Sequence, residues 1–345
     1  MDPHRSSTRH LAQGGSLFAA TQSFGDSIAL LDLAERPNRV VVATITVGTA
    51  PWGIAFDAES RRAYVATAEG VAVVDVDRRV LERSVSYRDQ PSVREFGEYR
   101  PGGTGIVVTP DGGRVYVGVH RRDRFSTVEI LDVASATIVG SLDVGERPFD
   151  VQISPDGRCV YSIDHDSFTV HTIDTGTAEV RRTLVAPFGT EGGHQSHQKL
   201  HYAAVADDGT LYMPFQGRGL VTFDPSDASY FTESMTGDTH QHGTSLTDDG
   251  RLLVVGVGPI GGATGGASLT IRTLDTGAEI VLPLDRGHEN VVPWRDPVTG
   301  RHFAVLTGGS TSRNPWDGLT LVDLETLDTS MIPVPGRPQQ MVPIG

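Results

Sequence analysis

The stretch Phe149–Asp164, FDVQISPDGRCVYSID, decides the fold of this chain. Apolar and polar residues alternate on both sides of an Asp-Gly pair, which predicts two antiparallel strands joined by a tight turn. The chain continues with FTVHTIDTGT at 168–177 and VRRTLVAP at 180–187, which predict a third and a fourth strand. Together these segments define a four-stranded unit of about 45 to 50 residues.

Copies of this unit recur along the chain with the same order of strands and turns. They begin near Pro51 (PWGIAFDAESRRAYVAT), Gly103 (GTGIVVTPDGGRVYVGV), His201 (HYAAVADDGTLYMPF), His242 (HGTSLTDDGRLLVVGV) and His288 (ENVVPWRDPVTGRHFAVLTG). A seventh unit is split, because RPQQMVPIG at 337–345 supplies one strand and SLFAATQ, SIALLDLAE and RVVVATITVG near the N-terminus supply three. A ring closed in this way has no unpaired edge strand. The sequence therefore predicts an all-β, seven-bladed β-propeller of four-stranded antiparallel blades. We expect one domain over residues 16–345, behind a flexible N-terminal tail at 1–15.

The 345-residue chain is acidic, with a formal net charge of −14, and 38% of its residues are hydrophobic. That hydrophobic fraction supports a folded core, whereas the negative charge argues against nucleic acid or an anionic membrane as partner. No run approaches the ~20 apolar residues that span a membrane, and the first residues lack the apolar stretch of a secretion signal, so we expect a cytoplasmic protein. The only cysteine, Cys159, lies in an apolar segment that predicts a buried structural thiol. The sequence does not indicate an oligomeric state.

Three units open with a histidine at nearly the same repeat position, namely His201, His242 and His288. The remaining units have other residues at that position: Trp52, Thr104, Phe149 and Gln339. Because a propeller places equivalent positions around one axis, we expect the three histidines to converge at one mouth of the axial channel. Two unusually long connections, 86–102 and 185–201, are expected to reach the same face, and loops of this length are often functional.

A metal centre would account for these histidines. Neutral imidazole binds Fe, Cu, Zn and Mn, and a catalytic centre typically has three protein ligands and an open position. We predict a divalent transition metal, of unassigned identity, bound by residues from this set: His201, His242, His288, His194, His197 and His240. The alternative is a channel without metal, in which stacked histidines bind an anion or a chain of ordered water.

Candidate catalytic residues are expected around the same mouth. Glu191 and Glu289 are available as a fourth ligand, as a hydrogen-bond partner of a ligand, or as a general base. His120 and His165 end the second strands of their units, and we expect them to face the substrate or to line the channel.

Each of several other side chains near the mouth has two possible roles. Three arginines are placed to bind a substrate carboxylate or to tie neighbouring blades through salt bridges: Arg100, Arg147 and Arg337. Trp52 and Phe149 either form an apolar wall for a ligand or plug the ring. Residues of the first long connection are expected to cover the mouth, among them Glu95, Glu98 and Tyr99.

The units SPDGRCVYSIDHDSFTVHTIDTGT and TPDGGRVYVGV resemble the YVTN-type repeats of the lactonase-like seven-bladed propeller superfamily, over essentially the whole chain. The resemblance implies the fold and leaves the activity open, because that superfamily includes lactonases, lyases, oxidoreductase subunits and proteins with no known reaction. Our first hypothesis is a metal-dependent enzyme of specialised metabolism that acts on a small molecule, by redox or by hydrolytic or lyase chemistry. The second is a lactonase-like hydrolase, and the third is a non-enzymatic interaction scaffold.

Overall fold

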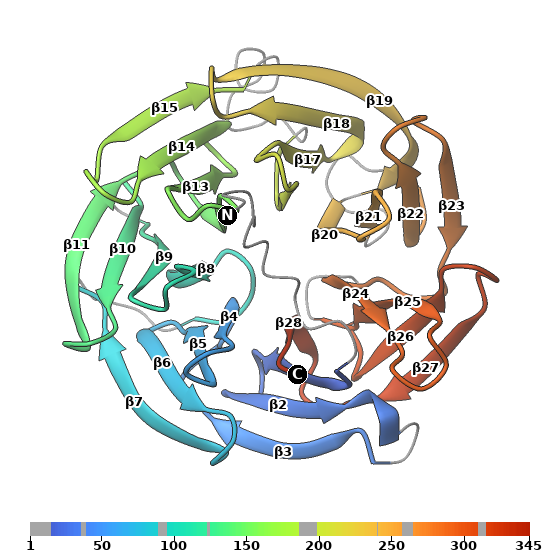
Figure 1. Ribbon diagram of the computed structural model, residues 1–345, viewed down its shortest axis with the longest axis horizontal. Helices are drawn as coiled ribbons and strands as arrows, with labels where there is room; N and C mark the ends of the chain where they lie inside the picture. The colour runs from blue at the N-terminus through green and yellow to red at the C-terminus, as the bar shows by residue number, and fades with distance from the viewer. Residues whose placement is uncertain are drawn as a thin grey trace, which may run out of the picture.

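The computed structural model describes residues 15–35, 39–88, 95–122, 125–185, 199–239, 241–256, 265–309 and 315–345. Within these ranges the chain forms seven four-stranded antiparallel sheets arranged as a ring (Figure 1). This confirms the predicted seven-bladed β-propeller. The predicted N-terminal tail lies outside the described residues, apart from Gly15.

Blades one to four follow the chain, each running from its innermost to its outermost strand. Blade one comprises β4 (Ile54–Asp57), β5 (Arg62–Ala66), β6 (Gly70–Asp75) and β7 (Val80–Ser86). Blade two comprises β8 (Gly102–Val108), β9 (Arg114–His120), β10 (Thr127–Asp132) and β11 (Thr137–Asp143). Blade three comprises β12 (Pro148–Ile153), β13 (Cys159–Asp164), β14 (Thr169–Asp174) and β15 (Val180–Leu184). Blade four comprises β16 (Ala204–Val205), β17 (Leu211–Phe215), β18 (Gly217–Asp224) and β19 (Ser229–Thr239).

Blades five and six repeat this order, and blade seven joins the two ends of the chain. Blade five comprises β20 (Gln241–Leu246), β21 (Arg251–Gly256), β22 (Ser268–Thr273) and β23 (Glu279–Pro283). Blade six comprises β24 (Val291–Arg295), β25 (His302–Thr307), β26 (Gly318–Asp323) and β27 (Thr329–Pro333). Blade seven comprises β28 (Pro338–Pro343), β1 (Leu17–Gln22), β2 (Ser27–Asp32) and β3 (Val41–Thr46).

The ring closes through backbone pairing between β28 and β1. Their register sets Ala19 opposite Val342 and Ala20 opposite Met341. The N–H of Leu17 donates to the carbonyl of Gly345 at 2.7 Å, which extends the pairing to the C-terminus. The split seventh blade predicted from the sequence is therefore confirmed.

The hydrophobic core lies between neighbouring blades. One cluster joins Ile163 and Val170 of blade three to Leu211 and Val221 of blade four, all of them buried. Two sheets can pack face to face in this way because alternate residues of each strand point to one neighbour or the other. Cys159 is only half-buried, because it is the first residue of β13, so the prediction of a buried thiol was wrong in degree.

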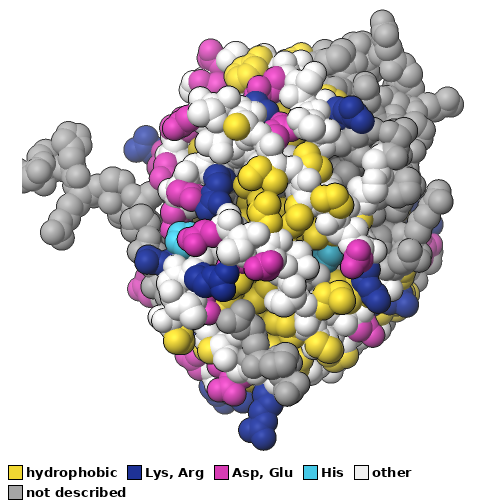
Figure 2. Space-filling model, turned by 90° about the vertical axis from the view of Figure 1, so that its right-hand side faces the viewer, with side chains coloured by type: hydrophobic (Ala, Val, Ile, Leu, Met, Phe, Trp, Pro, Cys, Tyr) yellow, Lys and Arg dark blue, Asp and Glu magenta, His cyan; other side chains and the backbone are white. Residues whose placement is uncertain are grey.

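The outermost strands are largely exposed, as the pattern along β7 and β15 shows. Figure 2 shows one side of the molecule, where hydrophobic side chains gather in the middle with acidic and basic side chains around them. The only helical element within the described ranges is the 3-10 turn η1 (Leu33–Glu35), and no described helix is long and apolar enough to cross a membrane.

The seven matched positions at the starts of the inner strands are all buried. Their side chains expose at most 2% of their surface: Trp52, Thr104, Phe149, His201, His242, His288 and Gln339. The repeat therefore places all seven in the interior of the ring.

Candidate metal centre

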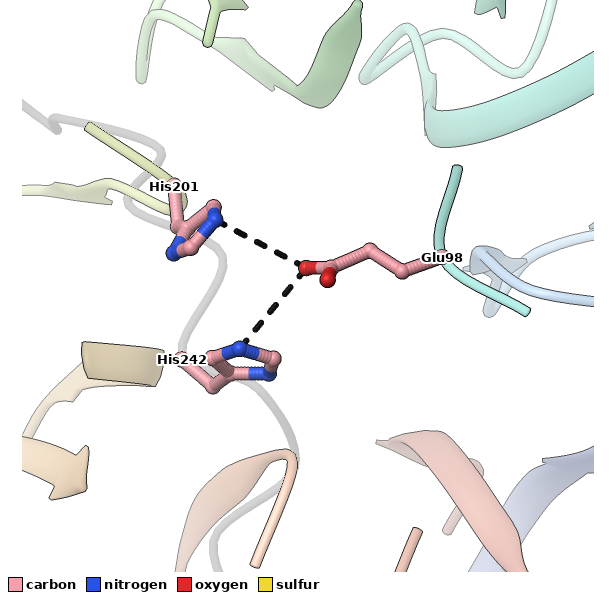
Figure 3. A group of neighbouring side chains, drawn as sticks. All are labelled: Glu98, His201 and His242. Carbon is pink, nitrogen blue, oxygen red and sulfur yellow. Dashed lines mark ion pairs between the residues drawn. The ribbon is translucent and has the colours of Figure 1, made fainter. Parts of the chain in front are cut away.

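Glu98, His201 and His242 bring three ligand atoms together inside the ring, all within 4.8 Å of one another (Figure 3). Oε1 of Glu98 lies 3.7 Å from Nε2 of His201 and 3.7 Å from Nε2 of His242. All three residues are buried, with exposures of 5%, 1% and 0%. Such a group of buried ionisable side chains is costly unless the charges are paired or hold a cation.

The three residues come from different parts of the ring. His201 lies just before β16 and His242 lies in β20, so the two histidines occupy matched positions on neighbouring blades. Glu98 comes from the connection before β8 and reaches the histidines from the other side (Figure 3). The repeat supplies the two imidazoles, and a connection between blades supplies the carboxylate.

Gly243 lets His242 sit close to blade six. A Cβ at this position would lie 2.4 Å from the Cα of Asn290, so only glycine permits this approach of β20 to the start of β24. The N–H of Gly243 donates to the carbonyl of Glu289 at 2.8 Å. His242 is thereby held beside the Glu289 side chain.

Glu289 fixes the orientation of the His242 ring. Nδ1 of His242 lies 2.6 Å from Oε2 of Glu289, and the same oxygen accepts a hydrogen bond from Nε2 of Gln339 at 3.1 Å. When Nδ1 carries the proton, the lone pair of Nε2 is directed at Glu98, which is the arrangement commonly found for a histidine that binds a metal. Burial lowers the pKa of His242, but the Glu289 and Glu98 carboxylates outweigh burial and raise it above its ordinary value.

The Glu98 carboxyl is buried beside the two imidazoles. Burial raises its pKa to about 7, against the opposing effect of His242. Oε1 has no hydrogen-bond partner among the described residues, because its 3.7 Å distances to the imidazoles are too long for a hydrogen bond. Two atoms that bind one metal at about 2.1 Å in tetrahedral geometry lie roughly 3.4 Å apart. The observed spacing is therefore close to that of a metal site.

His165 packs against His201 from the side of blade three. The two rings are stacked, with centroids 4.3 Å apart and planes inclined by 13°. Nδ1 of His165 lies 2.8 Å from Oδ1 of Asp166, and burial lowers the pKa of His165 to about 4. His165 is therefore a neutral imidazole at neutral pH, next to a candidate ligand.

His120 ends β9 on the same face and is also buried. Its Nδ1 lies 3.5 Å from Oγ of Ser126, and burial lowers its pKa to about 4. Both positions agree with the expectation that these histidines end the second strands of their blades.

His288 stands apart from the group although it occupies the matched position on blade six. Its Nε2 lies 2.8 Å from Oγ1 of Thr320, and Trp316 packs edge-on against its ring at 5.5 Å. The structure therefore brings together two of the three matched histidines and places the third against blade six. Glu289 contacts a candidate ligand and is not one of the three residues that converge.

Four sequence candidates lie outside the described residues: Glu191, His194, His197 and His240. Glu98 was expected only to cover the mouth, so its convergence with the histidines was missed. The available signal was an acidic residue in one of the two long connections that approach the histidine-bearing face.

The three arginines differ in their partners. Nη1 of Arg147 pairs with Oδ2 of Asp166 at 2.6 Å, which ties the arginine to its own blade. Arg100 is buried and donates from Nη2 to the carbonyl of Gly103 at 2.6 Å. Arg337 lies over the ring of Phe24, with its Cζ 4.5 Å from the centroid.

Comparison with known proteins identifies the architecture alone. No family model matches the chain, and no curated protein matches its sequence. Among solved structures, Kuenenia stuttgartiensis hydrazine synthase is similar over 97% of this chain and 99% of that one, with a TM-score of 0.65 and 15% sequence identity. Similarity at this level of identity concerns the fold and carries no activity across. The chain is thus a seven-bladed β-propeller, and its function has to be argued from its own residues.

Proposed function

We propose that this protein is a metal-dependent enzyme that acts on a small molecule, with a divalent transition metal bound by Glu98, His201 and His242. The observation that carries the proposal is the convergence of one carboxylate oxygen and two imidazole nitrogens, all buried, inside the ring. Both distances from Oε1 of Glu98 to the imidazole nitrogens are 3.7 Å, longer than a direct hydrogen bond and close to the separation of two atoms that bind one ion.

The donor set favours a first-row transition ion. Two imidazoles and one carboxylate hold catalytic Zn²⁺ in hydrolases and Fe²⁺ in oxygenases, and imidazole also suits Cu²⁺. Mn²⁺ accepts the same carboxylate readily. Three protein ligands leave coordination positions for water or substrate, where the ion would polarise a bound group or activate water or dioxygen.

The surroundings favour a small substrate. A cavity of about 630 Å³ is lined by residues in or directly before five inner strands, among them Ala203, Thr244 and Asn290. These residues lie one or two positions along the chain from His201, His242 and Glu289, although none of the three candidate ligands lines the cavity itself. Its volume falls within the range of ligand pockets.

Three neighbouring side chains have defined parts in the proposal. Glu289 holds the His242 imidazole with Nε2 on the side of Glu98, and Gln339 holds Glu289 in turn. His165, held by Asp166 and stacked on His201, supports the position of the His201 imidazole.

Metal-stripped protein, titrated separately with Zn²⁺, Fe²⁺, Mn²⁺ and Cu²⁺, tests the proposal when each loaded form is assayed for lactone or ester hydrolysis and for dioxygen consumption. We expect the parent to bind one ion per chain and to turn over substrate in one of the assays only when the ion is present. Glu98→Gln and His242→Ala should lose both the bound ion and the turnover. His302→Ala, at the start of β25, is the control for metal binding and should keep the ion. A protein that binds the ion without turnover in either assay would contradict the enzymatic part. A folded protein that takes up none of the four ions would contradict the whole proposal.

A further inference from the structure

We propose that residues 95–101 form a strap over the mouth of the channel, and that Tyr99 and Arg147 are positioning residues that hold its Glu98 carboxylate on the metal. The inference rests on the proposed metal site and adds the device that sets its affinity. Glu98 needs such a device because it belongs to a connection between blades, where no strand pairing fixes its position.

Tyr99 anchors the strap next to Glu98. Its ring lies against Phe149, with centroids 5.6 Å apart, and edge-on to His165 at 6.1 Å. The guanidinium of Arg147 lies over the same ring, with Cζ 4.3 Å from the centroid. A cation within about 6 Å of an aromatic centroid is attracted to the ring face. Tyr99 is therefore held against blade three by Phe149 and Arg147, although 42% of its surface is exposed.

The contacts around Tyr99 reach His201 as well as Glu98. Arg147 pairs with Asp166 at 2.6 Å, and Asp166 lies 2.8 Å from Nδ1 of His165. His165 is stacked on His201 at 4.3 Å. The set of contacts therefore couples the position of Glu98, through its chain neighbour Tyr99, to the position of His201.

The other end of the strap is anchored on blade seven. Phe96 stacks on Phe24 with centroids 5.7 Å apart, and Arg337 covers the Phe24 ring. Gly97, between Phe96 and Glu98, has φ of +93°, a conformation that other residues rarely adopt. The strap thus runs from blade seven to blade three, with Glu98 between its two aromatic anchors.

The two arginines that cover aromatic rings of the strap or beneath it occupy the same position of the repeat. Arg147 and Arg337 each precede a proline and stand two residues before a buried inner-strand residue, with φ of +56° and +52°. Each guanidinium covers an aromatic ring at one end of the strap or beneath it. Two copies of one repeat feature therefore act on the same segment.

The contacts around Tyr99 lower the cost of metal binding because they order the carboxylate beforehand. Without them, Glu98 has to be fixed when the ion arrives, and preorganisation of this kind contributes directly to affinity. Loss of one partly buried cation–π contact corresponds to a five- to thirty-fold weaker affinity, as an order of magnitude.

Titration of metal-stripped protein with Co²⁺ tests the inference, because the visible spectrum of Co²⁺ reports its coordination number as well as the affinity. We expect Arg147→Met and Tyr99→Ala to weaken binding about five- to thirty-fold and to change the spectrum. Tyr99→Phe and Arg147→Lys, which keep the ring or the charge, should retain most of the affinity. Arg286→Met is the matched control, because Arg286 covers Trp316 at 5.3 Å beside His288, away from the three ligands.

The outcomes separate this inference from the proposed function. Failure of the parent protein to bind Co²⁺ would contradict the metal site itself. Binding by the parent, with Arg147→Met and Tyr99→Ala equal to it in affinity and spectrum, would contradict the strap alone. Equal losses in Arg147→Met and Arg286→Met would also contradict it. Thermal unfolding of the metal-free variants shows whether each is folded. If Arg147→Met does not fold, Tyr99→Ala tests the strap in its place.

Discussion

Asp150 lies in β12 with its carboxylate buried between blades three and four. Oδ2 accepts hydrogen bonds from the N–H of Ala203 and from Nε2 of Gln152, each at 2.9 Å. Burial raises the pKa of Asp150 from 3.8 to about 6, in spite of these hydrogen bonds. The folded protein therefore holds this proton more tightly than the unfolded chain.

That difference fixes the sign of a pH effect on stability. Below about pH 4 both states are protonated, and between pH 4 and 6 only the unfolded chain loses the proton, so the free energy of unfolding falls as pH rises. Asp150→Asn keeps an oxygen acceptor and cannot ionise. Relative to the parent, we expect it to gain stability by up to about 3 kcal/mol between pH 4 and 7. Urea unfolding of both proteins at these two pH values measures the change, and a difference that does not vary with pH would contradict the prediction.

His288 provides a second test at the scale of single residues. It is buried and paired with Thr320, away from Glu98, so His288→Ala should cost ~2 kcal/mol of stability and leave metal content unchanged. His242→Ala should remove the metal. Thermal unfolding and metal analysis of the two variants distinguish these roles, and loss of metal from a folded His288→Ala protein would overturn the assignment of ligands.

The sequence predicted the residues of the site in part. The matched positions identified His201 and His242, because repeat equivalence in a propeller converts sequence spacing into spatial convergence. The same argument grouped His288 with them, since spacing does not show that a side chain turns toward Thr320 of its own blade. Glu98 was missed as a candidate ligand because connections between blades follow no repeat.

At the scale of elements, the hairpin between the third and fourth strands has one conformation in several blades. In blade three the N–H of Ala178 donates to the carbonyl of Asp174 at 2.9 Å, and Ala178 has φ of +61°. In blade five Gly277 makes the same bond to Thr273 at 2.8 Å, with φ of +67°. The repeat thus shows that glycine suits this position.

Ala178→Gly should therefore stabilise the protein. The left-handed conformation strains a residue that has a Cβ, and relief of that strain outweighs the extra freedom of glycine in the unfolded chain, for a net gain of ~0.5 kcal/mol. Ala58→Gly is the control, because Ala58 is an exposed turn residue whose φ is not positive, and it should destabilise by a similar amount. Chemical denaturation measures both, and a loss of stability in Ala178→Gly would contradict the prediction.

The elements themselves were largely predictable. Alternating apolar residues around Asp-Gly turns located the strands, since a strand buried on alternate faces has a period of two. The innermost strand of blade four is the exception, because β16 spans only Ala204–Val205 although the sequence suggested a longer strand. Short backbone pairing of this kind depends on neighbouring blades and leaves no sequence pattern.

At the scale of the whole molecule, closure of the ring depends on the last strand. Removal of residues 336–345 would leave β1 as an unpaired edge and open the interface between blades six and seven. We expect the truncated protein to lose cooperative unfolding and to aggregate, as seen by thermal unfolding and size-exclusion chromatography. A synthetic peptide of residues 336–345 should restore the transition. Unfolding of the truncated protein at the parent's temperature would show that closure does not stabilise the ring.

The most direct test of the central claim is the metal content of tag-free protein, measured by mass spectrometry after exposure to Zn²⁺, Fe²⁺, Mn²⁺ and Cu²⁺ and removal of excess ion. The proposed centre predicts close to one ion per chain in the parent and in His288→Ala, and almost none in folded Glu98→Gln or in the double variant His201→Ala/His242→Ala. A parent without metal, or one whose metal survives in the folded double variant, would contradict a centre formed by Glu98, His201 and His242.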